Sequence, residues 1–288
     1  MPELLRPTAL VRLPAGPVEY RLDRRGDAVV LVFHGGHMRA GLALGEDVFA
    51  AGGYTVLVPS RPGYGGTPLS TGKSAQRYAD AVRALCAHLA IARIAAVVGI
   101  SGGGPTAATM AARHADLVER LVLVSAVGWL PFPDRRTRLG SYVMFNGITE
   151  RLTWAGVHRF ARAAPDVCLR LMMGSLSTRP VGEVVAALRA EDRAWLLALF
   201  AQMRSGRGFL NDLRRTPDVT ARIDQPTLVI ATRADGGVPF AQGESLARTI
   251  RHAELFESNA DSHFVWLGPD WPMIADRIRV FLEAPAGP

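Results

Sequence analysis

The sequence predicts an α/β fold, with a mostly parallel sheet of about eight strands flanked by helices and an inserted helical lid. Short apolar runs typical of strands alternate with amphipathic runs typical of helices over most of the chain. Several strand-like runs are apolar throughout, as expected for strands covered on both faces. One long helical stretch, residues 128–222, interrupts this alternation.

The first half of the chain supplies an edge hairpin and several parallel strands. Two runs at 8–13 and 17–22, separated by Pro14-Ala15-Gly16, predict an antiparallel hairpin at one edge of the sheet. The elements expected next are a strand at 28–33, a helix at 42–52, a strand at 54–59, a helix at 74–89, a strand at 94–99, a helix at 103–114 and a strand at 120–125.

The second half resumes the alternation after the helical stretch. Its expected elements are a strand at 226–231, a helix at 240–250, a strand at 253–257 and a helix at 270–283. Because residues 128–222 lie between two strands of one sheet, we expect them to form an insertion over one sheet edge. The predicted organisation is therefore a core of residues 1–127 and 223–288 with a helical lid of residues 128–222.

The composition is that of a globular protein. With 288 residues, 49% hydrophobic and 20% charged, the chain can bury a large core and is not expected to be disordered. Residues 94–112 carry no charge, which would also suit a membrane span. However, Gly102-Gly103-Gly104-Pro105 would place helix breakers at mid-membrane depth, where free backbone groups lack partners. A buried strand, a sharp turn and a buried helix explain this segment better.

The charge pattern and the cysteines predict a small-molecule substrate, with no nucleic-acid partner and no disulfide framework. The net charge is +7, but Lys73 is the only lysine and the arginines are scattered, so we expect no nucleic-acid binding. The N-terminus lacks an apolar segment after a basic start, which predicts no signal peptide and a cytoplasmic protein. Cys86 and Cys168 are expected to be reduced thiols. No His, Cys, Asp or Glu cluster has metal-ligand spacing, and the sequence leaves monomer or homodimer open.

The residue most suited to chemistry is Ser101. It lies in Gly99-Ile100-Ser101-Gly102-Gly103, a G-x-S-x-G pattern that follows an apolar strand and opens an apolar helix. Such a turn strains the serine backbone, and the glycines avoid clashes that a Cβ would cause. It also places the hydroxyl at a helix N-terminus, which favours a developing anion. The alternative, a phosphate-binding turn, would lack both the P-loop lysine and the G-x-G-x-x-G spacing.

This turn resembles the nucleophile elbow of the α/β-hydrolase family, and two further motifs share the resemblance. His34-Gly35-Gly36 is similar to the family's oxyanion segment, which implies an oxyanion hole made by the amides of Gly36 and Gly102, with His34 bracing the loop. The stretch "PSRPGYGGTP" at 59–68 is similar to the family's D-x-R-G-x-G-x-S loop, with Ser60 where an aspartate is common. That loop is structural in most members.

The family's chain order of serine, acid and histidine implies the other members of a triad. Asp235 comes a few residues after the predicted strand at 226–231, and His263 comes just after the last predicted strand. In this assignment His263 takes the proton of Ser101, and Asp235 holds the imidazole tautomer.

Several residues compete for these roles. Asp134 occupies a position that some family members use for the acid, and it stays open as the alternative to Asp235. Asp261 is too close to His263 in sequence to orient its ring from the far side. The histidines that compete weakly for the role of base are His37, His158 and His252.

The resemblance implies hydrolysis through a Ser101 acyl-enzyme, with a carboxylic ester as the expected substrate and no cofactor. Lactone, amide or thioester hydrolysis, perhydrolysis and acyl transfer to an alcohol use the same triad and stay open. A serine nucleophile argues against dehalogenases and epoxide hydrolases, which use aspartate there. A non-catalytic small-molecule receptor of the same fold is the alternative from another class, and an intact Ser, His and acid set argues against it.

The lid segment is rich in aromatic residues and methionines. It leaves and rejoins the sheet at the carboxyl ends of strands, the edge at which Ser101 opens, so part of its apolar surface should cover the pocket. The residues expected to border the substrate are His37, Trp129, Met172 and Met173. The sequence thus predicts a small, uncharged and apolar substrate.

Overall fold

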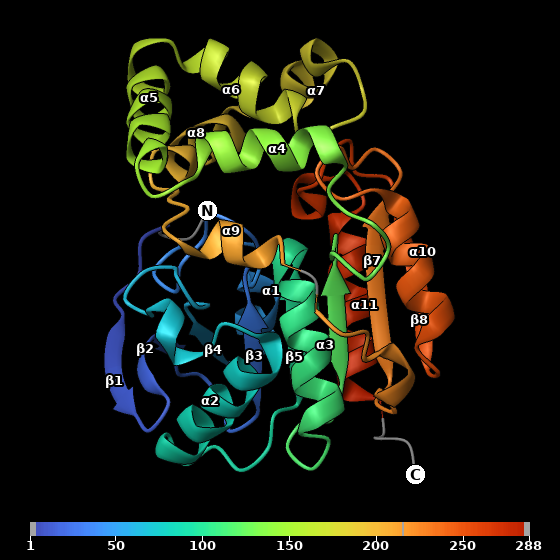
Figure 1. The fold of residues 1–288 in the computed structure, drawn as a ribbon. Helices are drawn as coiled ribbons and strands as arrows, with labels where there is room; N and C mark the ends of the chain where they lie inside the picture. The colour runs from blue at the N-terminus through green and yellow to red at the C-terminus, as the bar shows by residue number, and fades with distance from the viewer. Residues whose placement is uncertain (1–3, 215, 285–288) are drawn as a thin grey trace.

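The computed structural model describes residues 4–214 and 216–284. Its centre, within these residues, is an eight-stranded sheet with the order β1-β2-β4-β3-β5-β6-β7-β8 (Figure 1). The strands are β1 (Ala9–Leu13), β2 (Gly16–Asp23), β3 (Val29–Phe33), β4 (Thr55–Pro59), β5 (Ala96–Ile100), β6 (Leu121–Val124), β7 (Thr227–Thr232) and β8 (Ala253–Ser258). The predicted fold class is confirmed.

The antiparallel part of this sheet is confined to one edge. β1 pairs with β2 and β2 with β4 in antiparallel register, so that Val11 lies opposite Val18. The remaining neighbours are parallel, with Val32 of β3 beside Val98 of β5. Strands β3 to β7 are buried along their whole length, which explains why their sequences are continuous apolar runs.

Helices cover both faces of the sheet. The helices of the core are α1 (Asp47–Ala51), α2 (Ala75–His88), α3 (Gly104–Arg113), α10 (Phe240–Thr249) and α11 (Trp271–Glu283). On one face, Leu85 of α2, Met110 of α3 and Leu246 of α10 join a single buried cluster. On the other face, Phe49 of α1 and Ile278 of α11 belong to a second cluster.

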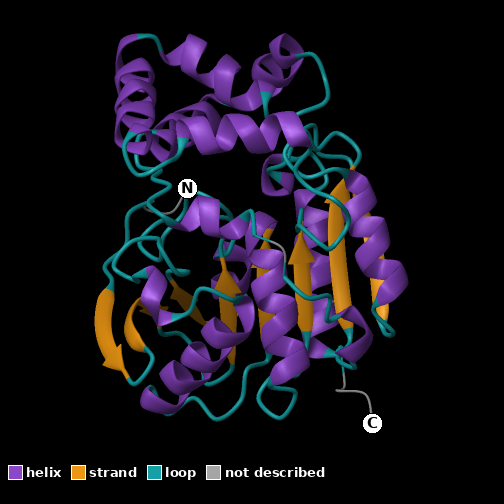
Figure 2. Cartoon of the chain, in the orientation of Figure 1, coloured by secondary structure: helices purple, strands orange, loops and turns teal. Residues whose placement is uncertain are grey.

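The lid lies beyond the carboxyl ends of the parallel strands, toward which the strand arrows point (Figure 2). Its helices are α4 (Arg135–Met144), α5 (Thr149–Ala163), α6 (Pro165–Gly174), α7 (Val181–Ala187), α8 (Ala190–Phe200) and α9 (Gly208–Asp212). Helix α9 lies between the rest of the lid and the sheet (Figure 1). The apolar cluster that contains Phe49 continues into the lid, where Trp195 meets Phe264 of the core with ring centroids 6.4 Å apart.

The helix predicted at 42–52 is wrong in its first half, because α1 begins only at Asp47. Leu42 instead pairs with Leu5 in an antiparallel bridge, and Gly45 has a φ of +71°. An α-helix needs a negative φ at every residue. The ring of Trp266 occupies the space where a Cβ on Gly45 would stand, at 2.8 Å, so this turn before α1 requires glycine.

Two further expectations concern the membrane and the cysteines. No helix in the described part of the chain is long and apolar enough to cross a membrane. Cys86 in α2 and Cys168 in α6 are free, buried thiols. Burial raises the pKa of Cys86 to about 12, so its thiol stays protonated at neutral pH.

Candidate active site

Ser101 occupies a strained position between β5 and α3. It opens a 3-10 turn, Ser101–Gly103, with a φ of +53°. This conformation costs a non-glycine residue on the order of 1–3 kcal/mol. Glycines on both sides make the turn feasible: a Cβ on Gly99 would lie 2.8 Å from Ala107 Cβ, and one on Gly103 would lie 2.1 Å from the Phe33 carbonyl oxygen. The turn thus brings β5, α3 and the end of β3 into close contact at Ser101.

Asp235 and His263 form a buried hydrogen-bonded pair. Asp235 follows β7, His263 follows β8, and His263 Nδ1 lies 2.7 Å from Asp235 Oδ2. The other carboxylate oxygen, Oδ1, accepts hydrogen bonds from the backbone N–H groups of Gly237 and Val238, both at 2.7 Å. Because an ionised carboxylate can only accept, Nδ1 carries the ring proton and Nε2 is left as the basic nitrogen.

The segment after β6 contacts both the serine and the histidine. The backbone N–H of Val127 donates to the Ser101 carbonyl oxygen at 2.9 Å, and the Ser125 hydroxyl donates to the His263 carbonyl oxygen at 3.1 Å. Strand β6 lies between β5 and β7 in the sheet. Ser101, Asp235 and His263 therefore gather at one carboxyl edge, around the end of β6.

The segment His34-Gly35-Gly36 follows β3 and lies against Ser101. A Cβ on Gly35 would stand 2.8 Å from Ser101 Cβ and 3.2 Å from its Oγ, so this position requires glycine. The backbone nitrogen of Gly36 lies 3.5 Å from the position that a Cβ on Gly102 would take. The Gly36 nitrogen thus lies close to Gly102, the residue that follows the serine.

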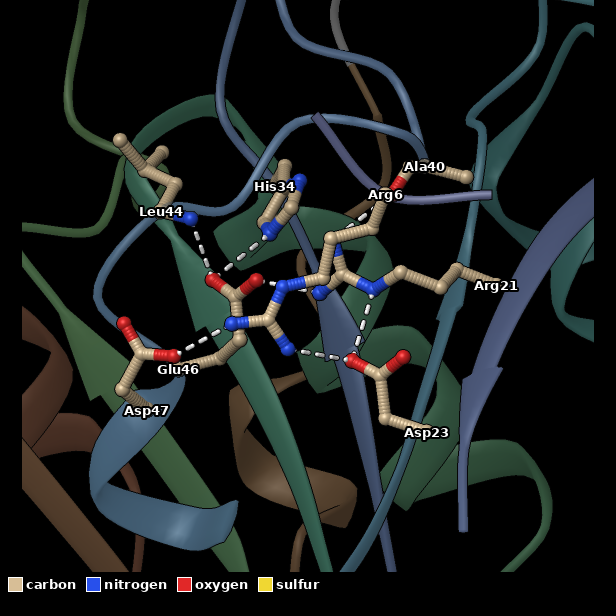
Figure 3. Close-up of polar contacts among 8 residues, drawn as sticks. All are labelled: Arg6, Arg21, Asp23, His34, Ala40, Leu44, Glu46 and Asp47. Atoms are coloured by element: carbon tan, nitrogen blue, oxygen red, sulfur yellow. Dashed lines mark hydrogen bonds and ion pairs between the residues drawn. The ribbon is translucent and has the colours of Figure 1, made fainter. Parts of the chain in front are cut away.

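A buried network of charges holds the His34 side chain (Figure 3). Glu46 receives hydrogen bonds from Arg21 and from His34, whose Nε2 lies 3.3 Å from Oε2. Burial raises the pKa of Glu46, but the interactions with His34 and Arg21 lower it by a larger amount. The pKa of Glu46 therefore lies well below its usual range. The residues that complete the network in Figure 3 are Arg6, Asp23, Ala40, Leu44 and Asp47. Glu46 stays ionised and ties the loop after β3 to β2.

The lid adds a short extended segment to the loops of Asp235 and His263. Ser177 pairs with Asp235 in an antiparallel bridge, and its hydroxyl donates to the Asp261 carbonyl oxygen at 2.5 Å. The carboxylate of Asp261 forms an ion pair with Arg179 of the same segment. Sequence analysis missed this contact because most of it is made by backbone groups, which every residue carries.

His37 lies in an aromatic cluster beside the oxyanion segment. Its ring centroid lies 4.1 Å from that of Phe209, 4.9 Å from that of Phe145 and 5.1 Å from that of Trp154. His37 Nδ1 lies 2.7 Å from the Ser205 hydroxyl, which accepts a hydrogen bond from Trp154 Nε1 at the same distance. Burial lowers the pKa of His37 to about 3, against the opposing effect of Glu150. His37 is therefore neutral at pH 7.

The other residues named from the sequence have structural contacts. Trp129 Nε1 donates to the Pro217 carbonyl oxygen at 3.0 Å. Met173 is buried in the apolar cluster of the lid, and Met172 packs against that cluster. Asp134 is exposed and caps the first turn of α4, so the acid that the structure pairs with His263 is Asp235. In the ranges that the structure describes, no three His, Cys, Asp or Glu side chains are arranged to hold a metal ion.

Comparison with known proteins agrees with this architecture. The family model for the alpha/beta hydrolase fold matches residues 28–269. The chain is 30% identical over 280 residues to the uncharacterized hydrolase YcgS of Bacillus subtilis (strain 168), covering 95% of this chain and 98% of the relative. It is 35% identical over 249 residues to a 2-hydroxy-6-oxononadienedioate/2-hydroxy-6-oxononatrienedioate hydrolase of Pseudomonas sp, covering 83% of this chain and 82% of that protein.

Among solved structures, an alpha/beta hydrolase fold protein from Nakamurella multipartita superposes with a TM-score of 0.80 at 28% identity. The match covers 96% of this chain and 99% of that one. Sequence, fold and the arrangement of the strands thus lead to the same assignment. The chain belongs to the α/β-hydrolase fold family and is related to hydrolases.

Proposed function

We propose that this chain is a serine hydrolase that cleaves a carboxylic ester, or a related acyl substrate, through an acyl-enzyme on Ser101. The observation that carries the proposal is the buried pair of His263 and Asp235, 2.7 Å apart, at the sheet edge that also carries Ser101. A hydrogen-bonded acid and histidine with a strained serine at one strand edge is the arrangement that acyl transfer requires.

The protonation of His263 supports a role as general base. Its Nδ1–H donates to Asp235, so Nε2 can accept the Ser101 proton as Oγ attacks the substrate carbonyl carbon. The resulting imidazolium is stabilised by Asp235, whose other carboxylate oxygen accepts hydrogen bonds from two backbone N–H groups. His263 then returns the proton to the leaving alcohol, and a water molecule hydrolyses the acyl-enzyme by the reverse sequence of proton transfers.

The amides of Gly36 and Gly102 are the proposed donors to the tetrahedral oxyanion. The proposal is supported by the 3.5 Å separation between the Gly36 nitrogen and the Cβ position of Gly102. Fixed donors of this kind contribute about 3–4 kcal/mol each to transition-state stabilisation in comparable sites. The Gly36 amide belongs to the loop after β3, and the Gly102 amide belongs to the turn after the neighbouring strand β5.

The surroundings favour an uncharged substrate. Phe209 lies 3.0 Å from the Cβ position of Gly36, and the neighbouring His37 is neutral at pH 7. The arginine nearest to the Gly102 Cβ position, Arg61, is already neutralised by Asp212. The Pseudomonas relative is named for a dienedioate, which is a dicarboxylate. A site of that type would need free cationic groups near the serine.

A fluorophosphonate probe tests the proposal directly. We expect the probe to label the wild-type chain, with the adduct mapped to Ser101 by peptide mass spectrometry, and to leave Ser101→Ala unlabelled. Ser101→Ala should also lose about 10⁴–10⁶ in kcat on p-nitrophenyl esters. Labelling elsewhere, or a Ser101→Ala variant that keeps more than a few per cent of activity, would refute the assignment. A folded wild-type chain that binds esters without being labelled would instead be a receptor.

A further inference from the structure

We propose that Arg61 is the positioning residue of the oxyanion hole, and that the lid residue Asp212 holds it in place. The inference rests on the proposed function, since it assigns a role within that hole. Arg61 lies in the loop after β4, in the "PSRPGYGGTP" stretch, and is 4% exposed. It comes within reach of the oxyanion segment on one side and of lid helix α9 on the other.

Arg61 binds the carbonyl groups of the oxyanion segment. Its Nε donates to the His34 carbonyl oxygen at 2.8 Å, and its Nη2 donates to the Gly35 carbonyl oxygen at 3.0 Å. The peptide between Gly35 and Gly36 is trans, so its C=O and N–H point in opposite directions. Because Arg61 holds the Gly35 carbonyl group, the Gly36 N–H is fixed so that it points away from Arg61.

This peptide needs such a restraint because both of its residues are glycines. Without a Cβ on either side, alternative φ and ψ values are accessible at little cost, and the peptide plane can rotate. Glycine is nevertheless required at position 35, where a Cβ would meet Ser101 at 2.8 Å. The backbone freedom that Gly35 introduces is removed by the two hydrogen bonds of Arg61.

Asp212 holds the guanidinium in a fixed plane. Its two carboxylate oxygens accept from Arg61 Nη1 at 2.6 Å and from Nη2 at 2.7 Å, and the Tyr64 hydroxyl donates to Oδ2 at 2.6 Å. Such bidentate geometry restricts both the position and the rotation of the guanidinium. The Nη2 atom is shared, because it donates to Asp212 and to the Gly35 carbonyl group.

The same contacts join the lid to the oxyanion segment. Asp212 ends α9, and Phe209 of that helix lies 3.0 Å from the Cβ position of Gly36. The helix is attached to the Arg61 loop by the N–H groups of Arg207 and Gly208, which donate to the Gly63 carbonyl oxygen. The docking of α9 and the orientation of the Gly36 amide therefore depend on the same set of contacts.

The test compares two lid carboxylates. Asp212→Asn keeps the shape but removes the charge that holds Arg61. The matched control is Asp192→Asn, because Asp192 is a buried lid carboxylate that forms a bidentate pair with Arg189 and has no contact with the oxyanion segment. For each variant we would measure kcat and KM on p-nitrophenyl butyrate, and inhibition by an alkyl trifluoromethyl ketone of similar length. Ser101 Oγ adds to the ketone carbon as its proton passes to His263, and the π electron pair of the carbonyl group becomes the lone pair of an oxyanion.

We expect Asp212→Asn to lower kcat about 10- to 100-fold with little change in KM, since the effect of a misplaced donor should not exceed that of a lost one. The affinity for the ketone should fall by a similar factor. Asp192→Asn should leave kcat and the affinity for the ketone unchanged, although its melting temperature should fall by about as much as that of Asp212→Asn. Tyr64→Phe, which removes one hydrogen bond to Asp212 but keeps the ion pair, should change kcat and ketone affinity in the same direction by a smaller factor.

Two outcomes would overturn the inference. One is an Asp212→Asn variant with wild-type kcat and ketone affinity, and the other is a loss confined to KM, which would indicate ground-state substrate binding. In both, Ser101 would still be labelled by the fluorophosphonate, so the proposed function would stand. Loss of that labelling in the wild-type chain is the result that would remove the proposed function itself.

Discussion

The carbonyl oxygen of Leu176, in the lid, accepts a hydrogen bond from the backbone N–H of His263 at 2.8 Å. It also accepts from the N–H of Gly236, the residue after Asp235, at 3.2 Å. One lid carbonyl group thus joins the loop of the proposed acid to the loop of the proposed base. The lid is therefore part of the framework that positions these two side chains.

Gly236→Ala tests this framework. A Cβ on Gly236 would lie 2.7 Å from the backbone nitrogen of Ser177, so the lid segment must move away from the Asp235 loop. We expect kcat/KM on p-nitrophenyl butyrate to fall at least about 10-fold, since misplacement of about 1 Å at a reacting centre can cost more than that. The control is Gly156→Ala in α5, where a Cβ meets nothing within 4 Å. It should keep activity and gain up to about 1 kcal/mol of stability. Equal activities of the two variants would contradict the framework role.

Asp235→Asn should lower kcat by about 10⁴, with the fold retained, because an amide at this position favours the wrong tautomer of His263. The comparison variant is Asp134→Asn, whose carboxylate caps α4 at the surface. That change should cost little stability, because asparagine caps a helix N-terminus about as well as aspartate, and it should leave kcat near the wild-type value. A larger loss of kcat in Asp134→Asn than in Asp235→Asn would reverse the assignment of the acid.

His37 should make the protein less stable in acid. Its pKa falls from 6.5 in the unfolded chain to about 3 in the fold, so between these values the unfolded state binds more protons. Stability is then lost as the pH falls below 6.5, by at most about 1.4 kcal/mol per pH unit. His37→Asn removes this titration, and asparagine tolerates the φ of +65° found there. Urea unfolding at pH 7 and pH 5 should show a smaller acid-induced loss in the variant, and equal losses would argue against a buried neutral histidine.

Glu46 is expected to affect the stability of the fold in a lower pH range than His37 does. Its pKa is depressed in the fold from an ordinary value of 4.5, so the stability it contributes is present above that value and is lost as the pH falls toward the folded-state pKa. Glu46→Gln removes one of the two carboxylates that pair with the buried Arg21, the other being Asp23, and should cost up to about 3–5 kcal/mol at pH 7. The difference from the wild-type chain should shrink at pH 3. A difference that is the same at both pH values would mean that Glu46 is not ionised in the fold.

Substrate preference follows from the aromatic cluster and the neutralised Arg61. We expect kcat/KM to be higher for p-nitrophenyl butyrate, hexanoate and octanoate than for a monoester of a dicarboxylic acid with matched chain length. Burying the free carboxylate of such a monoester without a partner charge is strongly unfavourable. A clear preference for the charged ester would show that an arginine of the lid reaches the substrate.

The order and type of most elements follow from the amino-acid sequence alone. Their hydrophobic periodicity and their capping and turn residues are local features of the chain. The buried strands are continuous apolar runs, and the helix Ala75–His88 begins at its capping residue Ser74. Likewise, glycines at positions 99 and 103 identify the turn at Ser101, since only glycine fits where a strand, a helix and a second strand meet.

Contacts between residues that are distant in the chain could not be predicted from local sequence and are seen only in the folded structure. Gly45, in the turn before α1, packs against the ring of Trp266, more than 200 residues further along the chain. The partners of Arg61, Glu46 and Leu176 are backbone carbonyls, amides and single charges from other elements, and none of these leaves a local pattern. Asp235 and Asp134 both follow a strand in sequence, and only the folded chain brings one of them to His263. Local chemistry therefore specifies the elements, whereas the contacts that orient the site form only when long-range packing closes them.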